Sequence, residues 1–105
     1  MKHIIVETTF DSESEAKRLA KMLIEQGLAA CVSIYKACSV YRWEGKLEEA
    51  DEFVLMAKTQ KSLYKTVEKF IKQNHSYDLP QIIATKIVAG SKGYLNWIDS
   101  ETERK

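Results

Sequence analysis

The chain has 105 residues, 45% of them hydrophobic, and a formal net charge of +1 from 16 basic and 15 acidic side chains. This length fits a single domain over residues 1–105, and the balanced charge argues against a nucleic-acid module, which normally carries a basic face. No apolar run reaches the ~20 residues of a membrane span, and no leader is apparent, so we expect a cytoplasmic protein without a membrane partner.

Alternating β-branched and aromatic residues predict a first strand over residues 3–10. Ile4, Val6, Thr8 and Phe10 share one of its faces. Ser12 and Glu15 then form the pattern of a capping box, so a helix should begin there. Its apolar stripe comprises Ala16, Leu19, Ala20, Leu23 and Ile24. Gly27 is expected to end the helix in the left-handed conformation.

Two long extended segments follow, from about Leu28 to Trp43 and from about Leu47 to Thr59, with a turn at Glu44-Gly45-Lys46. Each reaches roughly 13 residues, well beyond the usual five or six. A pair of short helices does not cover so long a hairpin, so part of it should pack on something else. Cys31 and Cys38 lie an odd number of residues apart, which points them to opposite faces and predicts free thiols.

Leu63, Val67, Phe70 and Ile71 predict a second helix that ends near Asn74. A polar connection follows, and residues 81–89 predict a fourth strand. Ser91 then caps a short last helix whose apolar side carries Tyr94, Leu95, Trp97 and Ile98.

The order βαββαβ, with long second and third strands and a short C-terminal helix, predicts an α+β ferredoxin-like sandwich. Both long helices should cover one face of its antiparallel sheet. Ile5 in the first strand and Ile82, Ala84 and Val88 in the fourth give the other face apolar residues as well. Exposed apolar sheet faces are aggregation hazards, so a homo-oligomer is expected.

Motifs for enzymatic chemistry are absent from the sequence: it has no Walker loop, no GxGxxG, no GxSxG and no HExxH. We therefore expect no enzyme. A Cys31–His75 nucleophilic pair is the least favoured alternative, because apolar neighbours of Cys31 make a thiol inert. His75 is either a helix C-terminal residue favoured by the dipole or a metal ligand, with Asp78 adding an oxygen.

Aromatic and charged residues gather in sequence around the hairpin turn and the last helix, chiefly Tyr41, Trp43, Lys58 and Trp97. The first interpretation is packing at a subunit contact, where Trp and Tyr are enriched. The alternative is an inter-subunit cleft, with Tyr77 as a further member, that binds a small anion opposite Lys58 or Arg42.

Five sequence blocks in order resemble the signature of CutA proteins: residues 28–32, 41–46, 58–59, 75–80 and 94–98. The resemblance implies a ferredoxin-like homotrimer whose long strands exchange pairing, with an architecture similar to PII signalling proteins. It also implies a non-enzymatic role in divalent-cation tolerance, the alternative being a PII-like signalling module for a small anion.

In the copper-binding pattern of that family, a strand-end cysteine joins two adjacent histidines. Here Thr8 matches the cysteine, Asn74 replaces the first histidine, and Ser76 replaces a proline, so His75 alone remains. The resemblance therefore implies weak binding of Cu(II) or another divalent cation, with no metal required for folding.

Overall fold

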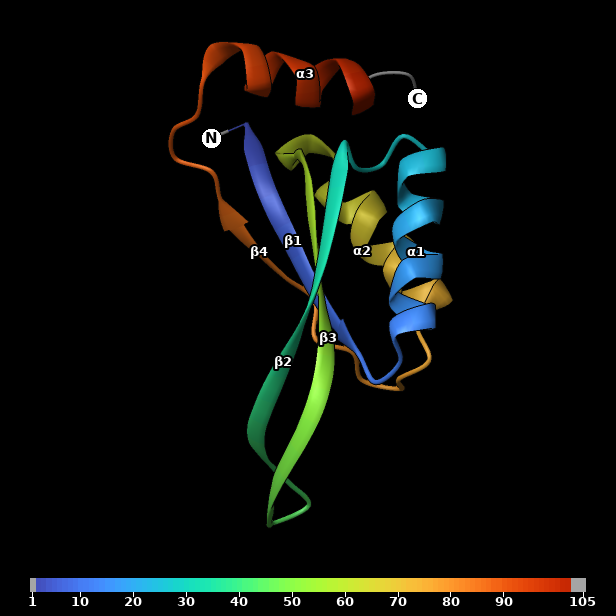
Figure 1. Ribbon diagram of the computed structural model, residues 1–105. Helices are drawn as coiled ribbons and strands as arrows, with labels where there is room; N and C mark the ends of the chain where they lie inside the picture. Colours follow the sequence, from blue (N-terminus) through green and yellow to red (C-terminus); the bar gives the residue numbers. More distant parts are fainter. Residues whose placement is uncertain (1, 103–105) are drawn as a thin grey trace.

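The computed structural model describes residues 2–102 and shows an antiparallel sheet packed against two helices (Figure 1). The elements are β1 (His3–Phe10), α1 (Glu13–Glu25), β2 (Cys31–Trp43), β3 (Lys46–Gln60), a 3-10 turn η1 (Lys61–Leu63), α2 (Tyr64–Asn74), β4 (Ile83–Lys86) and α3 (Lys92–Thr102). The four strands are ordered β2-β3-β1-β4. This is the ferredoxin-like α+β arrangement that the sequence predicted; of the predicted domain, residues 1 and 103–105 lie outside the description.

The core lies between the sheet and helices α1 and α2. The predicted face of β1 is confirmed, since Val6, Thr8 and Phe10 are fully buried and Ile4 is 4% exposed. Leu55 and Ala57 continue this face on β3, opposite Thr8 and Val6. Helix α1 adds Ala16, Leu19 and Leu23, and helix α2 adds Val67 and Ile71, all fully buried.

Local signals set the ends of α1 much as expected. The Ser12 hydroxyl accepts a hydrogen bond from the Glu15 backbone N–H at 3.3 Å, while the Glu15 carboxylate pairs with Arg18. At the other end Gly27 has a φ of 69°, and the Leu28 N–H bonds back to the Leu23 carbonyl. One stripe residue departs from the prediction: Ile24, near the end of α1, is 38% exposed.

The β2–β3 hairpin extends beyond the rest of the molecule (Figure 1). Glu44 and Gly45 both have positive φ, 50° and 80°, which is the two-residue turn suited to the twist of a hairpin. Strand β1 pairs with β3 only as far as Phe53, so residues 37–52, the hairpin tip, pair only with each other. The radius of gyration is 14.3 Å, against about 13 Å for a compact chain of this length.

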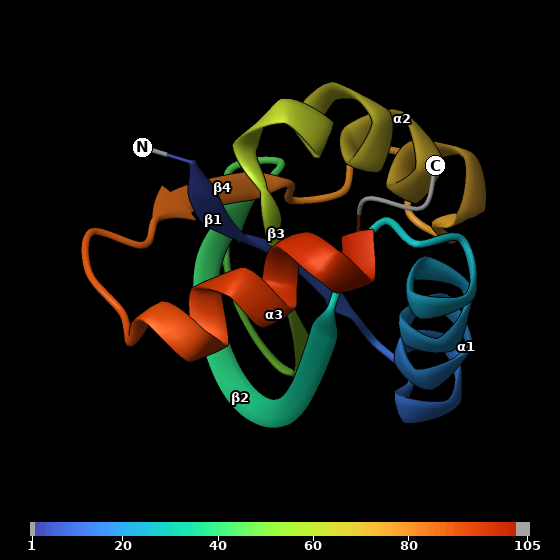
Figure 2. The same cartoon turned by 90° about the horizontal axis from the view of Figure 1, so that it is seen from above.

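Helix α3 crosses the end of the sheet at the start of β1 (Figures 1 and 2). Two side-chain contacts hold it there. His3 Nε2 lies 2.8 Å from Asp99 Oδ1, and the Gln60 amide donates to the Thr102 hydroxyl at 2.8 Å. Ile98 is fully buried beneath the helix, whereas the predicted apolar residues Tyr94 and Trp97 are 40% and 41% exposed.

Strand β4 is shorter than the predicted residues 81–89. It spans only Ile83–Lys86, and these four residues pair with Ile4–Glu7 of β1. Past that point the Ile87 N–H bonds to the His3 carbonyl and the chain leaves the sheet, so Val88 is 77% exposed. Within residues 2–102, no helix is both long and apolar enough to cross a bilayer.

Candidate functional site

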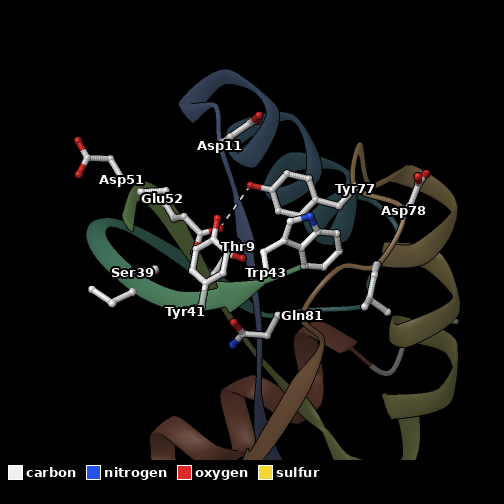
Figure 3. Close-up of a pocket in the computed structure, with 13 residues that line it drawn as sticks. Thr9, Asp11, Ser39, Tyr41, Trp43, Asp51, Glu52, Tyr77, Asp78 and Gln81 are labelled. Atoms are coloured by element: carbon white, nitrogen blue, oxygen red, sulfur yellow. Dashed lines mark hydrogen bonds between the residues drawn. The ribbon is translucent and has the colours of Figure 1, made fainter. Parts of the chain in front are cut away.

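An open cavity of ≈ 820 Å³ lies between the hairpin tip and the connection from α2 to β4 (Figure 3). We call it the hairpin cavity. Strands β2 and β3 supply one wall, the end of β1 supplies the floor, and residues 77–81 supply the other wall. The lining residues are Thr9, Asp11, Ser39, Val40, Tyr41, Trp43, Ala50, Asp51, Glu52, Tyr77, Asp78, Leu79 and Gln81.

Four carboxylates and no basic side chain line the hairpin cavity. Tyr77 donates its hydroxyl to Glu52 Oε2 at 3.3 Å, which joins the two walls (Figure 3). Burial, then the negative charges of Glu52 and Asp11, raise the pKa of Tyr77 to about 12. The phenol therefore stays protonated at neutral pH, and the charged side chains that line the cavity within one chain are all acidic.

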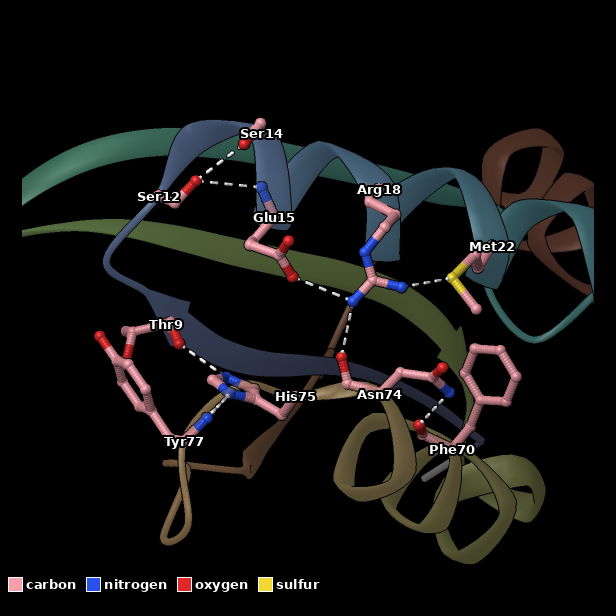
Figure 4. Close-up of polar contacts among 10 residues, drawn as sticks. All are labelled: Thr9, Ser12, Ser14, Glu15, Arg18, Met22, Phe70, Asn74, His75 and Tyr77. Atoms are coloured by element: carbon pink, nitrogen blue, oxygen red, sulfur yellow. Dashed lines mark hydrogen bonds and ion pairs between the residues drawn. The ribbon is translucent and has the colours of Figure 1, made fainter.

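His75 is fixed beside this cavity by three contacts (Figure 4). Its ring stacks on Phe10 with centroids 4.1 Å apart and planes 6° apart. Nε2 lies 2.8 Å from the Thr9 carbonyl and so carries the proton, while Nδ1 accepts from the Tyr77 backbone N–H at 3.0 Å. Burial, the largest influence, lowers the pKa of His75, opposed by the Thr9 carbonyl and by Asp11 and Glu15. The imidazole is thus a neutral support for the Tyr77 backbone.

Arg18 secures the same junction from helix α1. Its Nη2 donates at 3.0 Å both to Glu15 Oε1 and to the backbone carbonyl of Asn74, the last residue of α2 (Figure 4). The side-chain amide of Asn74 donates to the Phe70 carbonyl at 2.8 Å. Asn74, which stands where the copper-binding pattern has a histidine, therefore caps the end of α2.

The residues predicted to hold a metal do not form a closed metal site. Both nitrogens of His75 are engaged with backbone groups, and Asp78 is exposed at the rim of the hairpin cavity. Thr8 is fully buried in the core. Across residues 2–102, no group of three or more His, Cys, Asp or Glu side chains is placed to hold an ion. This donor set does not fit a tightly held resident metal.

The five residues predicted for one cleft separate into two groups within a chain. Tyr41, Trp43 and Tyr77 line the hairpin cavity. Lys58 and Trp97 lie instead near α3: the Lys58 ammonium is 5.7 Å from the Tyr94 ring centroid, and Tyr94 lies 5.5 Å from Trp97. Lys58 pairs with Ile5 near the start of β1, so one chain does not bring all five residues together, and the inter-subunit cleft stays a prediction.

The alternative Cys31–His75 pair is also separated by the sheet. Cys31 lies opposite Lys58, which lies opposite Ile5, whereas His75 contacts Thr9 at the far end of β1. Four residues of strand correspond to about 13 Å. Both cysteines are free thiols, as predicted.

Sequence reasoning missed the acidic lining residues, chiefly Asp11, Asp51 and Glu52. A usable signal was present, since the two-residue turn fixes Trp43 opposite Lys46 and hence Ala37 opposite Glu52. Counting back from the turn would have placed Tyr41 and Glu52 on one face of the hairpin.

Comparisons with known proteins agree with this architecture. Residues 4–101 match the family model described as CutA1 divalent ion tolerance protein. The chain is 43% identical to the divalent-cation tolerance protein CutA of Archaeoglobus fulgidus over 96% of this chain and 99% of that one. It is 39% identical to the chloroplastic protein CutA of Arabidopsis thaliana, of which it spans 55%. A solved structure described as the periplasmic CutA of Archaeoglobus fulgidus superposes with a TM-score of 0.93 at 42% identity, covering 95% of this chain and 98% of that one.

Proposed function

Because the chain belongs to the CutA1 divalent ion tolerance family, we propose that it works as a non-enzymatic homotrimer in the response to divalent metal ions. The observation that carries this proposal is the apolar surface of the hairpin tip. Val40 and Leu47 share one face of the hairpin tip and are 60% and 76% exposed.

We expect a second copy of the chain to bury this surface. The whole outer edge of β2 is also without a strand partner in the described chain, since β2 lies at one end of the sheet. Long open edges and contiguous apolar patches are hazards that assembly removes. The number of subunits, three, comes from the family resemblance.

Native mass spectrometry at micromolar concentration tests the assembly. We expect a species of three 12.1 kDa chains. The variant Leu47→Asp should dissociate it, because a carboxylate would enter the buried interface, whereas Glu49→Gln on the same strand should not. A wild-type protein that is monomeric at this concentration would contradict the trimer.

For the metal-linked part of the role, we propose weak, exchangeable binding of Cu(II) or another divalent cation at the loop of His75 and Asp78. An incoming ion must displace the Tyr77 N–H from Nδ1, which keeps the affinity low. Calorimetric titration with Cu(II) and Zn(II) should show weaker binding to His75→Ala and Asp78→Asn than to the wild type and to His3→Ala. Equal affinities in all four proteins would exclude this loop.

A PII-like signalling role is the second candidate function, and one structural observation favours it. The Lys58 ammonium lies beside the aromatic pair Tyr94 and Trp97, a combination suited to an anionic ligand. A thermal-shift screen of anionic metabolites, with Lys58→Ala as the control, tests this role; no stabilisation by any anion would count against it.

A cytoplasmic location also stays a prediction.

A further inference from the structure

Helix α2 and the turn before it carry a row of exposed lysines. Lys61 in η1 and Lys65, Lys69 and Lys72 in α2 are all exposed to solvent. Their spacings of four, four and three residues place them on one side of the helix. We call these four residues the lysine stripe, and we propose that it binds a linear inorganic polyphosphate chain. The proposal is independent of both the assembly and the metal-linked role proposed above.

The lysine stripe lies on the free side of α2. Val67 and Ile71 of the same helix are fully buried in the core against the sheet. With about 3.6 residues per turn, the stripe falls on the side of the helix opposite to them. The hairpin tip, which the proposed assembly buries, extends away from α2 (Figure 1). The stripe therefore stays accessible when a second copy covers the tip.

No acidic side chain of the described chain pairs with the lysine stripe. The ion pairs found among residues 2–102 involve none of its four lysines. Glu68 is the one acidic residue of η1 and α2, and its carboxylate accepts from the Tyr64 hydroxyl at 3.3 Å. Lys2 adds positive charge at one end, because its carbonyl accepts from the Lys61 N–H at 2.7 Å. The stripe therefore presents a net positive charge to solvent.

The position of the stripe also opposes the helix dipole. Helix α1 follows the usual rule, with Glu13 and Glu15 in its first turn and Ser12 as its cap. Helix α2 has no acidic residue in its first turn and no side-chain cap, and Lys61 and Lys65 stand at its positive end. Lysines at that end cost stability rather than add to it. Folding therefore does not explain their placement, whereas an anionic ligand does.

The surroundings of the stripe distinguish among polyanions. Within residues 2–102, every exposed large apolar side chain lies outside η1 and α2. The stripe thus lacks the apolar residues with which a helix enters a lipid surface or forms the centre of a protein interface. It contains no arginine, and the two aromatic residues of α2, Tyr64 and Phe70, are half-buried and offer no open ring for a nucleic-acid base. What remains is a row of ammonium groups, which bind phosphate oxygens as point charges.

The length of the stripe requires a ligand with several linked phosphates. At about 1.5 Å per residue, Lys65 and Lys72 lie roughly 10 Å apart along the helix axis, farther than the oxygens of one orthophosphate reach. A single exposed charge contact is weak in water. When the phosphates are linked, every contact after the first is intramolecular, so weak contacts add up to measurable affinity.

The first test is a calorimetric titration of the protein with sodium polyphosphate in buffer free of divalent cations. We expect saturable binding that weakens with salt. At about −0.7 per contact, as for flexible single strands, four contacts give a log–log slope of about −3, or roughly fifty-fold between about 50 and 200 mM salt. Orthophosphate at the same total phosphate concentration should bind at least about ten-fold more weakly, because it cannot span the stripe.

A pair of double variants then locates the site. Lys65→Gln/Lys69→Gln should weaken polyphosphate binding about ten-fold at low salt and reduce the slope to about −1.5. Lys17→Gln/Lys21→Gln is the matched control, because it removes two exposed lysines with the same spacing from helix α1. The control should change the affinity by less than about two-fold. Thermal denaturation of both variants confirms that each is folded.

Three other polyanions test the identity of the ligand: a single-stranded DNA oligonucleotide, polyglutamate and vesicles that contain phosphatidylserine. Each should bind more weakly than polyphosphate at the same concentration of negative charge. Tighter binding of any of the three, no binding of polyphosphate, or equal losses in the two double variants would each overturn the proposal.

Discussion

The two ends of the long hairpin differ in burial: one end lies in the core of the molecule, and the tip is exposed. In the base of the molecule, residues 2–36 and 53–102, strand β3 places Leu55 and Ala57 in a core where neither is exposed. In the hairpin tip the same strand leaves Leu47 76% exposed. One strand thus carries apolar residues for two purposes: those of the base stabilise the fold of the chain, and those of the tip are available for contact with another molecule.

The largest expected effect comes from making the same substitution in both halves. Leu55→Ala should lower the free energy of unfolding by about 2–5 kcal/mol, because it removes buried methyl groups and leaves a cavity. Leu47→Ala should cost little within one chain but should weaken the assembly. Urea unfolding over a range of protein concentrations separates the two effects. The loss of unfolding free energy in Leu55→Ala should not depend on protein concentration, whereas the loss in Leu47→Ala should grow on dilution. The same concentration dependence in both variants would contradict the difference between base and tip.

A smaller effect tests how completely the base is packed. The hydroxyls of Thr8 and Thr59 are buried and have no hydrogen-bond partner among the described residues. Thr8→Val should therefore raise the free energy of unfolding by about 1 kcal/mol, since it removes an unpaired polar group from the core. Thr102→Val is the opposite control, because that hydroxyl accepts from Gln60 and donates to the Ile98 carbonyl. Destabilisation by both substitutions would show that Thr8 has a partner.

Substitutions on the outer surface of the base should change the free energy of unfolding by less. Arg18→Ala removes the link from α1 to the Asn74 carbonyl, and should cost about 0.5–1 kcal/mol because the guanidinium is half-exposed and screened by water. Lys17→Ala, which loses only an exposed pair with Glu13 within the helix, should cost less than about 0.5 kcal/mol. Thermal denaturation of the two variants side by side gives the difference, and equal shifts would mean that the α1–α2 link adds nothing.

The smallest effect concerns His75, which lies where the base meets the hairpin cavity. Its folded-state pKa is below the ordinary 6.5, so folding favours the neutral ring. Its contribution to stability is therefore complete above pH 6.5 and is lost as the pH falls through 6.5 and then through the lower folded-state pKa. The difference in unfolding free energy between wild type and His75→Gln should shrink across this acidic interval. A difference that is constant with pH would contradict the lowered pKa.

Much of the base was predictable because its signals are local. The alternation in residues 3–10 identified the buried face of β1, and Ser12 and Gly27 marked both ends of α1. Strand β4 shows the limit of such signals. Its alternating pattern runs from residue 81 to 89, but only residues 83–86 pair with β1, which no local pattern shows.

The site was less predictable, because its members come together only in the tertiary structure. Within one chain Tyr41 and Trp43 meet Tyr77, whereas Lys58 lies near α3, and the cleft that would join them across subunits stays a prediction. His75 was identified as a candidate, but the sequence could not show that Thr9 and Tyr77 engage both its nitrogens. The sign of the cavity charge depends on the register of β2 and β3, which the turn residues set.

The turn at Glu44 and Gly45 also has a consequence for the order of folding. It joins β2 and β3 directly, so this hairpin is the most local pairing in the sheet and can form within roughly 1–10 μs. The pairing of β1 with β4 joins the two ends of the chain and must come later. During synthesis the hairpin therefore appears before β4 exists, with its outer edge open. The open edge can then pair with a strand of another chain, so newly made chains should aggregate more readily at high concentration.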